Sequence, residues 1–182
     1  MTIAISGKSG CGNSTVSRIV AERLGYRLVN YTFKNVAAER GMTFEEVCER
    51  AEVDPSFDRE LDKKQVAMAR EGDTVLGSRL AIWMLDDADL KVYLDAPVAV
   101  RASRIRQRML NSGDDAADFH TVLHETIERD QRDHDRYKRL YDIDNDQFEF
   151  VDLLIQASQM SPQEIADVIV HNVREREKKS GR

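Results

Sequence analysis

A glycine-rich turn at residues 7–15 constrains this chain more than any other feature. The apolar run 3–5 predicts a short buried strand before the turn, and helical spacing of apolar residues predicts a helix from about Ser14 to Gly25 after it. Glycines let backbone N–H groups turn inward around an anion, and the helix N-terminus adds to the attraction. The stretch therefore predicts a phosphate-binding loop, made of Gly7, Lys8, Ser9, Gly10, Cys11, Gly12, Asn13, Ser14 and Thr15.

One position of this loop departs from the usual pattern G-x-x-x-x-G-K-[ST]. Gly7, Gly12 and Ser14 fit the pattern, but Asn13 stands where it has lysine. That lysine is ordinarily a fixed positive charge beside the β- and γ-phosphates. We hypothesise that Lys8 partly replaces it, as the second loop residue does in some phosphate-loop ATPases that resemble this variant.

The remaining apolar runs predict an α/β fold in a single domain. A second strand at 26–30 completes a strand–loop–helix–strand unit, which implies a parallel sheet. Further strands are expected at 74–76, 90–94 and 151–155, so we predict a five-stranded parallel sheet flanked by helices.

Three segments outside these strands have distinct patterns. Residues 31–71 predict three short helices, either packed around the sheet or forming a mobile flap over a second substrate. The polar stretch 111–118 predicts a loop, and 119–141 a long helix. Ser161 opens a last helix with a capping box, and its basic tail, 174–182, is expected to fray.

Arginines gather in the second half of the chain. Arg79 follows the third strand, where ligands bind in open parallel sheets, although a surface ion pair would explain it equally. Arg104 and Arg108 are four residues apart and share one helix face. Such a face is often merely solvated, but guanidinium groups also fit phosphate oxygens well.

The long helix at 119–141 carries a second arginine stripe. Arg129, Arg132 and Arg136 fall on one stripe, and Asp133 lies four residues after Arg129 on the same stripe. The stripe is either an exposed face laced with ion pairs or a polyphosphate-binding face on which Asp133 accepts from a sugar hydroxyl.

Composition excludes several other classes. The net charge of −6 argues against general nucleic-acid binding, which needs an extended basic face. No apolar run approaches the ~18 to 20 residues of a membrane span, and no signal peptide opens the chain, so we expect a cytoplasmic protein. Cys11 and Cys48 are expected to be free thiols, Cys11 buried and inert. The histidines lack metal-binding spacing, and no metal site is assigned to them.

A phosphate loop, a helical insert and an arginine-rich second half together predict phosphoryl transfer between two bound ligands. The transferred group carries charge on three oxygens, so it needs cations around it and exclusion of water. No Ser-His-Asp or Cys-His set stands out.

Over nearly its whole length the chain resembles the short, archaeal-type cytidylate kinases, a class of P-loop nucleoside monophosphate kinases. The stretches that carry this resemblance are 33–34, 40–42, 58–62, 75–84, 88–94, 100–105 and 136–144. The resemblance implies a three-layer P-loop kinase fold that phosphorylates CMP or dCMP with ATP and Mg²⁺. It also implies a core of 1–30, 72–110 and 145–182, a monophosphate-binding insert at 31–71 and a lid at 111–144.

The resemblance also assigns roles to single residues. The loop would hold the ATP phosphates, with Ser14 on Mg²⁺. Lys34 stands where the family has an arginine for the acceptor phosphate, and lysine lacks the bidentate fork. The turn before it is shorter than in the family, which leaves base selectivity unassigned. The remaining roles that the resemblance implies are acceptor binding by Arg79 and Asp133, catalysis by Arg129 and Arg136, and ATP binding by Arg104 and Arg108. The hypothesis about the missing loop lysine adds Lys8 to the catalytic residues.

Two alternatives stay open at this point. The chain is either a kinase of another nucleoside monophosphate or small acceptor on the same fold, or a weak nucleotide-binding or regulatory protein because Asn13 replaces the loop lysine. The expected partners are nucleotides, without nucleic acid or membrane, and we expect a monomer.

Overall fold

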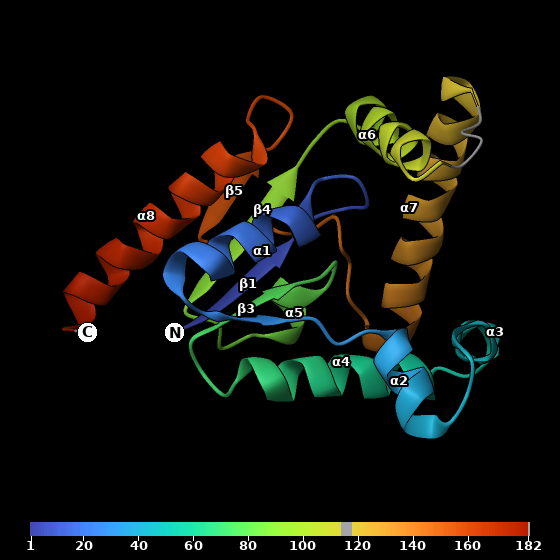
Figure 1. The fold of residues 1–182 in the computed structure, drawn as a ribbon, viewed down its shortest axis with the longest axis horizontal. Helices are drawn as coiled ribbons and strands as arrows, with labels where there is room; N and C mark the ends of the chain where they lie inside the picture. Colours follow the sequence, from blue (N-terminus) through green and yellow to red (C-terminus); the bar gives the residue numbers. More distant parts are fainter. Residues whose placement is uncertain (114–117, 182) are drawn as a thin grey trace.

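A five-stranded parallel sheet forms the centre of the computed structural model, which describes residues 1–113 and 118–181 (Figure 1). Its strands are β1 (Thr2–Ser6), β2 (Arg27–Val29), β3 (Thr74–Gly77), β4 (Leu90–Asp95) and β5 (Leu153–Gln156). They lie in the order β2-β3-β1-β4-β5, and Ile3 of β1 lies in register with Val75 of β3 and Leu90 of β4. The predicted α/β class and parallel sheet are confirmed.

Helices cover both faces of the sheet and extend beyond its carboxyl edge (Figure 1). On one face lie α1 (Asn13–Leu24) and α8 (Pro162–Ser180), and on the other α4 (Ser56–Ala69) and α5 (Ala81–Met84). Beyond the edge lie α2 (Phe33–Arg40), α3 (Phe44–Val53), α6 (Val98–Asn111) and α7 (Phe119–Tyr141). The helical layers on the two faces make three layers with the sheet.

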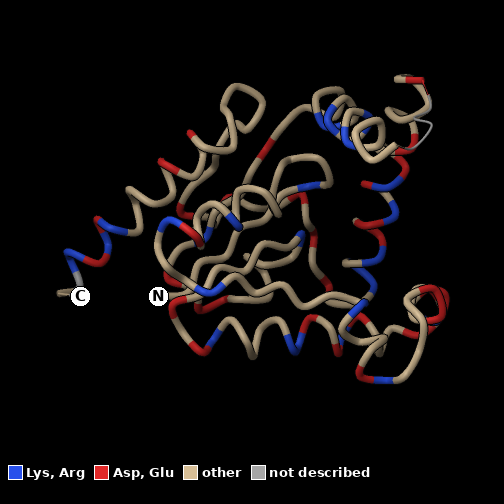
Figure 2. Tube along the Cα trace, in the orientation of Figure 1, with Lys and Arg blue, Asp and Glu red and all other residues tan. Residues whose placement is uncertain are grey.

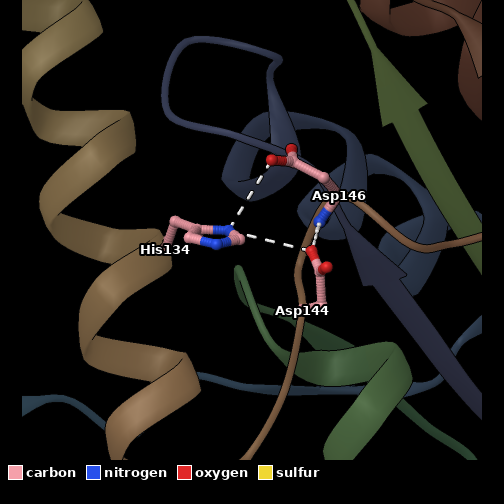
Figure 3. Close-up of side chains that lie close together, drawn as sticks. All are labelled: His134, Asp144 and Asp146. Atoms are coloured by element: carbon pink, nitrogen blue, oxygen red, sulfur yellow. Dashed lines mark hydrogen bonds and ion pairs between the residues drawn. The ribbon is translucent and has the colours of Figure 1, made fainter.

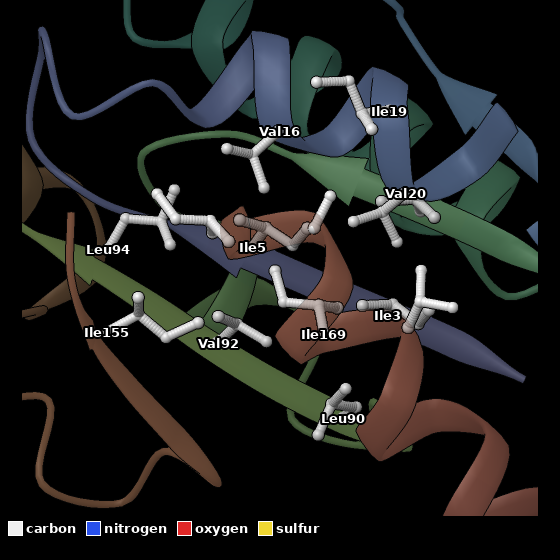
Figure 4. Close-up of a cluster of buried hydrophobic side chains, with 14 of the residues drawn as sticks. Ile3, Ile5, Val16, Ile19, Val20, Leu90, Val92, Leu94, Ile155 and Ile169 are labelled. Carbon is white, nitrogen blue, oxygen red and sulfur yellow. The ribbon is translucent and has the colours of Figure 1, made fainter. Parts of the chain in front are cut away.

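The alternation of side chains along β1 explains the two apolar clusters of the core. Ile3 and Ile5 point to the face covered by α1 and α8, where they pack with Val16 and Ile169 (Figure 4). Ala4 points to the other face, in the cluster of α4 and α5. Each fully buried branched side chain contributes about 1.5 to 3 kcal/mol, so these clusters fix the position of the turn after β1.

The insert formed by α2, α3 and α4 has an apolar cluster of its own. Tyr31, Val36, Val47 and Phe57 are buried in it. Thr32 and Thr43 start α2 and α3 with capping boxes, which satisfy N–H groups that would otherwise lack partners. The boundary of the insert stays a prediction, but its separate cluster is what a small subdomain requires.

The C-terminal tail differs from the sequence-based expectation. It does not fray after residue 174, because α8 continues to Ser180. Arg176 donates from Nη1 to the Asp89 carbonyl at 2.7 Å and pairs with Asp152, while Tyr26 donates to Glu177. These contacts tie the helix to the sheet.

Two smaller expectations concern loop ends and membrane spans. α6 ends at Asn111 and Asp118 caps α7, in agreement with a loop there, although 114–117 lie outside the described residues. Among the helices of the described ranges, none is both long and apolar enough to cross a membrane.

Candidate active site

A cavity of about 700 Å³ opens at the carboxyl edge of the sheet, where the loop after β1 faces α4 and α7. Its volume suits a small ligand pair, since ligand cavities typically measure about 300 to 1,000 Å³. The predicted site residues that line it are Lys8, Ser9, Gly10, Cys11, Gly12, Asn13, Ser14, Thr15, Arg79, Arg104, Arg108, Arg129, Asp133 and Arg136. Gly7 and Lys34 are not among its lining residues.

Asn13 closes the glycine-rich loop upon itself. Its Nδ2 donates to the Gly7 carbonyl at 2.6 Å, and the Cys11 N–H donates to the Lys8 carbonyl at 3.1 Å. An amide can satisfy the carbonyl, but it brings no charge to a phosphate. The residue that replaces the usual lysine therefore supports the shape of the loop, and the positive charge must come from elsewhere.

A buried arginine of α6, Arg101, also supports the glycine-rich loop. The Arg101 side chain is 5% exposed, donates to the Ser9 carbonyl at 3.1 Å and forms a bidentate ion pair with Asp130 of α7, the shorter contact being 2.6 Å. Gly10, at φ 88°, lies against the Arg101 backbone, and a Cβ there would come within 2.8 Å of the Arg101 carbonyl oxygen. The sequence alone does not reveal this pair, because Asp130 lies 29 residues further along the chain.

Lys8 is the one cationic residue of the loop at 7–15, and it already has a partner. Its Nζ lies 2.6 Å from Asp146 Oδ1. Asp146 in turn lies beside His134, whose Nδ1 is 3.6 Å from it and 3.8 Å from Asp144 (Figure 3). The structure thus gathers three metal-ligating groups that spacing had not suggested, although exposed acidic groups commonly lie together without an ion.

Two arginines of the cavity are paired with carboxylates from other elements. Arg79, just past β3, lies 2.5 Å from Asp133 of α7. Arg136 of α7 pairs with Asp58 of α4 and reaches the insert. Asp133 therefore forms an ion pair with Arg79, which is one of the two explanations that the sequence offered for this arginine. Both side chains also line the cavity.

Arg129 differs from these two, because no hydrogen bond or ion pair of its side chain exists among the described residues. Its pKa is lowered by desolvation and by the neighbouring charge of Arg79. Such crowding of guanidinium groups is unfavourable in the absence of an anion. Arg129 is thus a cation that an anionic ligand in the cavity would stabilise.

Arg104 and Arg108 of α6 approach the loop from the other side of the cavity. Arg104 donates from Nη2 to the Ala157 carbonyl at 2.7 Å, and Arg108 lines the cavity. Along α7 the Lys and Arg residues alternate with acidic ones, whereas α6 carries four arginines and no acidic residue, so the uninterrupted positive charge is confined to α6 (Figure 2).

Lys34 and Cys11 complete the predicted set. Lys34 lies in the first turn of α2, is exposed, and holds its ammonium 5.9 Å from the Phe44 ring of α3, away from the cavity lining. Cys11 and Cys48 are free thiols, as expected. Burial raises the pKa of the Cys11 thiol to about 11, which keeps it protonated and unreactive at neutral pH.

A further carboxyl group, Asp62 of α4, lies in the cavity wall without having been singled out from the sequence. It accepts a hydrogen bond from Tyr141 Oη at 2.5 Å. Desolvation raises its pKa to about 6, while Tyr141 lowers it and Asp58 raises it. The stretch 58–62 is one of those that carry the resemblance, but helical spacing alone does not show that Asp62 is partly buried and bonded to Tyr141 of α7.

These features first define a class. A phosphate loop between β1 and α1 and a cavity lined by arginines, at the edge of a parallel sheet, define a P-loop phosphotransferase. The fold agrees with that of shikimate kinase from Acinetobacter baumannii in complex with shikimate, with a TM-score of 0.61 at 19% identity over 96% of this chain and 93% of that chain.

Sequence comparison then gives the family. The cytidylate kinase-like family matches residues 2–159, and the chain belongs to it. Cytidylate kinase 2 of Borreliella afzelii is 40% identical over 184 residues, covering 99% of this chain and 100% of the relative. Cytidylate kinase of Pyrococcus horikoshii is 37% identical over 171 residues, covering 93% of this chain and 86% of the relative.

Proposed function

We propose that this protein transfers the γ-phosphoryl group of ATP to CMP or dCMP, giving ADP and CDP or dCDP. The observation that carries the proposal is a single cavity that joins the phosphate loop to the insert, with Arg79, Arg129 and Arg136 between them. Relatives of similar length that are named cytidylate kinases favour CMP as the acceptor.

The residues of the cavity divide the reaction between them. The backbone N–H groups of the loop and the α1 N-terminus bind the donor phosphates. Arg129 faces the phosphoryl group in transfer, where charge spreads over three oxygens. Arg79 and Arg136 bind the acceptor phosphate by exchanging their present carboxylate partners for it. Arg104 and Arg108 hold the donor nucleotide from α6.

The lysine that this loop lacks is replaced by cations from several elements. Lys8 contributes one of them, after leaving Asp146. Lys34 would contribute to acceptor binding only by moving from Phe44 towards the cavity.

Mg²⁺ fits this site through Ser14. The Ser14 side chain lines the cavity at the start of α1 and forms no hydrogen bond within the described part of the chain. Mg²⁺ commonly takes one or two protein ligands and completes its shell with phosphate oxygens and water, so a single hydroxyl is a sufficient protein contribution. When bound, the ion supplies positive charge to the phosphate oxygens. We further propose a cytoplasmic monomer.

A weak or silent nucleotide-binding protein is the second candidate, favoured by Asn13. The unpaired Arg129 argues against it, because a protein that only binds ATP has no need of a crowded cation between the two ends of the cavity.

A coupled ADP-release assay separates these functions. Wild-type protein is given ATP and Mg²⁺ with CMP, dCMP, UMP, AMP or shikimate, and a reaction without acceptor measures background hydrolysis. We expect CMP or dCMP to react with the highest kcat/KM. If AMP or shikimate reacts fastest, the acceptor assignment is wrong, and ATP binding without turnover of any acceptor would identify a silent protein.

A further inference from the structure

We infer that Asp62, held by Tyr141, accepts a hydrogen bond from the exocyclic amine of an acceptor cytosine and so selects cytosine over uracil. The inference rests on the proposed function and deepens it, because it names the residue that reads the base. Base selectivity was the property that the sequence left without a residue.

The pairing of the carboxylates in the cavity wall supports this choice. In the described residues, three aspartates line the cavity. Asp133 is paired with Arg79 and Asp58 with Arg136. Among residues 1–113 and 118–181, Asp62 forms no ion pair, and its one hydrogen-bond partner is the neutral phenol of Tyr141. A partly buried carboxyl group without a cation retains acceptor capacity for a ligand.

The position of Asp62 fits a base rather than a phosphate. It lies on α4 beside the C-terminal end of α7, whereas the phosphate loop lies across the sheet edge (Figure 1). Phe33, Leu61 and Leu140 line the same region and offer the apolar surface that a pyrimidine ring needs. A phosphate there would be repelled by the Asp62 carboxylate.

Hydrogen-bond chemistry gives the selectivity its direction. Cytosine presents an amine donor at position 4, where uracil presents a carbonyl acceptor. An ionised carboxylate only accepts, so it pairs with cytosine and opposes uracil. Sites that pair a buried polar group with a substrate donor discriminate strongly against analogues that lack the donor, because the group is then left unsatisfied.

Tyr141 acts in this scheme as a positioning residue. Its hydroxyl donates a hydrogen bond to Oδ2 of Asp62, and no hydrogen bond to Oδ1 exists among the described residues. Removal of the hydroxyl frees the carboxyl to rotate and weakens selectivity without removing the acceptor.

The test compares kcat/KM for CMP, dCMP and UMP in wild type, Asp62→Asn, Tyr141→Phe and Glu49→Gln. Asparagine keeps the shape but can turn an NH₂ towards the uracil carbonyl, so we expect the CMP/UMP ratio to fall at least about 10-fold. Tyr141→Phe should lower the ratio less. Glu49→Gln is a matched acid-to-amide change at an exposed position of α3, and it should leave the ratio unchanged.

Each other outcome overturns the inference. If the ratio of kcat/KM for CMP to that for UMP is unchanged in folded Asp62→Asn, Asp62 does not recognise the base, and the proposed function is unaffected. A change in the CMP/dCMP ratio alone would place the sugar hydroxyl at Asp62 instead. A wild type that does not prefer CMP to UMP defeats both proposals together. If Asp62→Asn fails to fold, Tyr141→Phe decides the question through the same ratio.

Discussion

The two ends of the cavity are held by different kinds of contact. At the donor end, which the loop 7–15 forms, side chains bind the backbone of the loop itself, as Asn13 does at Gly7 and Arg101 at Ser9. Ion pairs with Asp146 and Asp130 are added to these backbone contacts. At the acceptor end, which α4 and the C-terminal half of α7 form, side chains from separate elements bind each other, as Arg136 and Asp58 do. Backbone contacts fix a shape, whereas side-chain pairs can be exchanged for those of a ligand.

This difference indicates how each end performs its task. The donor end presents N–H groups to phosphates of constant shape, so it gains from being organised in advance. In the proposed function the acceptor end admits a monophosphate, and the ion pairs of α7 with Arg79, just past β3, and with α4 hold its cations beside the cavity. The four predictions below test this comparison.

The largest expected effect is on stability at the donor end. Arg101→Met leaves Asp130 partly buried without its cation, and losing one partner of a buried pair typically costs about 3 to 5 kcal/mol. Urea unfolding should show this loss. Arg18→Met breaks an exposed pair with Glu22 on α1 and should cost less than about 1 kcal/mol. Equal effects would mean that the loop is not supported by Arg101.

The second largest expected effect is on catalytic activity, at the part of the cavity wall between the donor end and the acceptor end. Arg129→Ala removes the cavity cation that we propose to face the transferred phosphoryl group, and the loss of one preorganised donor should lower kcat by about 100- to 1,000-fold. Arg132→Ala is the matched control, because its side chain is 70% exposed on the same helix. Comparable losses in both variants would show that α7 acts through general charge and not through Arg129.

Two single substitutions, at Lys8 and at its partner Asp146, test whether the donor end also contains a cation that can exchange its carboxylate partner for a phosphate. If Lys8 leaves Asp146 to bind phosphate, Lys8→Ala should lower kcat/KM for ATP by about 30- to 1,000-fold, corresponding to about 2 to 4 kcal/mol. Asp146→Asn should preserve or raise activity, because it frees the ammonium. If the two variants lose activity equally, the pair itself is the functional unit.

The same comparison explains what the sequence could predict. The strands, the loop and most helices follow from local patterns, such as the alternation in β1 and the capping box at Thr43. The glycine-rich part of the cavity wall also follows from a local pattern, because residues 8–15 line the cavity within one continuous stretch.

The acceptor end and the supporting contacts were harder to predict because their partners come from distant parts of the chain. Asp62 and Tyr141 are separated by 79 residues, and Arg101 and Asp130 by 29. Lys34 was expected at the acceptor phosphate from resemblance, but the capped first turn of α2 directs it towards Phe44. Tertiary packing decides such positions, and spacing along one helix does not reveal them.

The smallest expected effect is on the free energy of unfolding, which is lowered at neutral pH because Asp62 is ionised and partly buried at the acceptor end. Its pKa is raised from 3.8 to about 6, so between these pH values the folded state binds more protons than the unfolded state. The free energy of unfolding therefore falls as pH rises through this window, by up to about 3 kcal/mol for two pKa units. Asp62→Asn should be about 1 to 3 kcal/mol more stable than wild type at pH 7.5, with the difference vanishing near pH 4.

Denaturant unfolding at both pH values checks this expectation, with Glu49→Gln as the exposed control that should match wild type at each. A gain in stability that accompanies a loss of base selectivity would show that Asp62 is retained for ligand binding and against stability, as strained or buried polar groups at active sites often are. A difference of the same size at pH 4 and pH 7.5 would instead assign the gain to packing. The acceptor end would then lack the uncompensated carboxyl group that distinguishes it from the donor end.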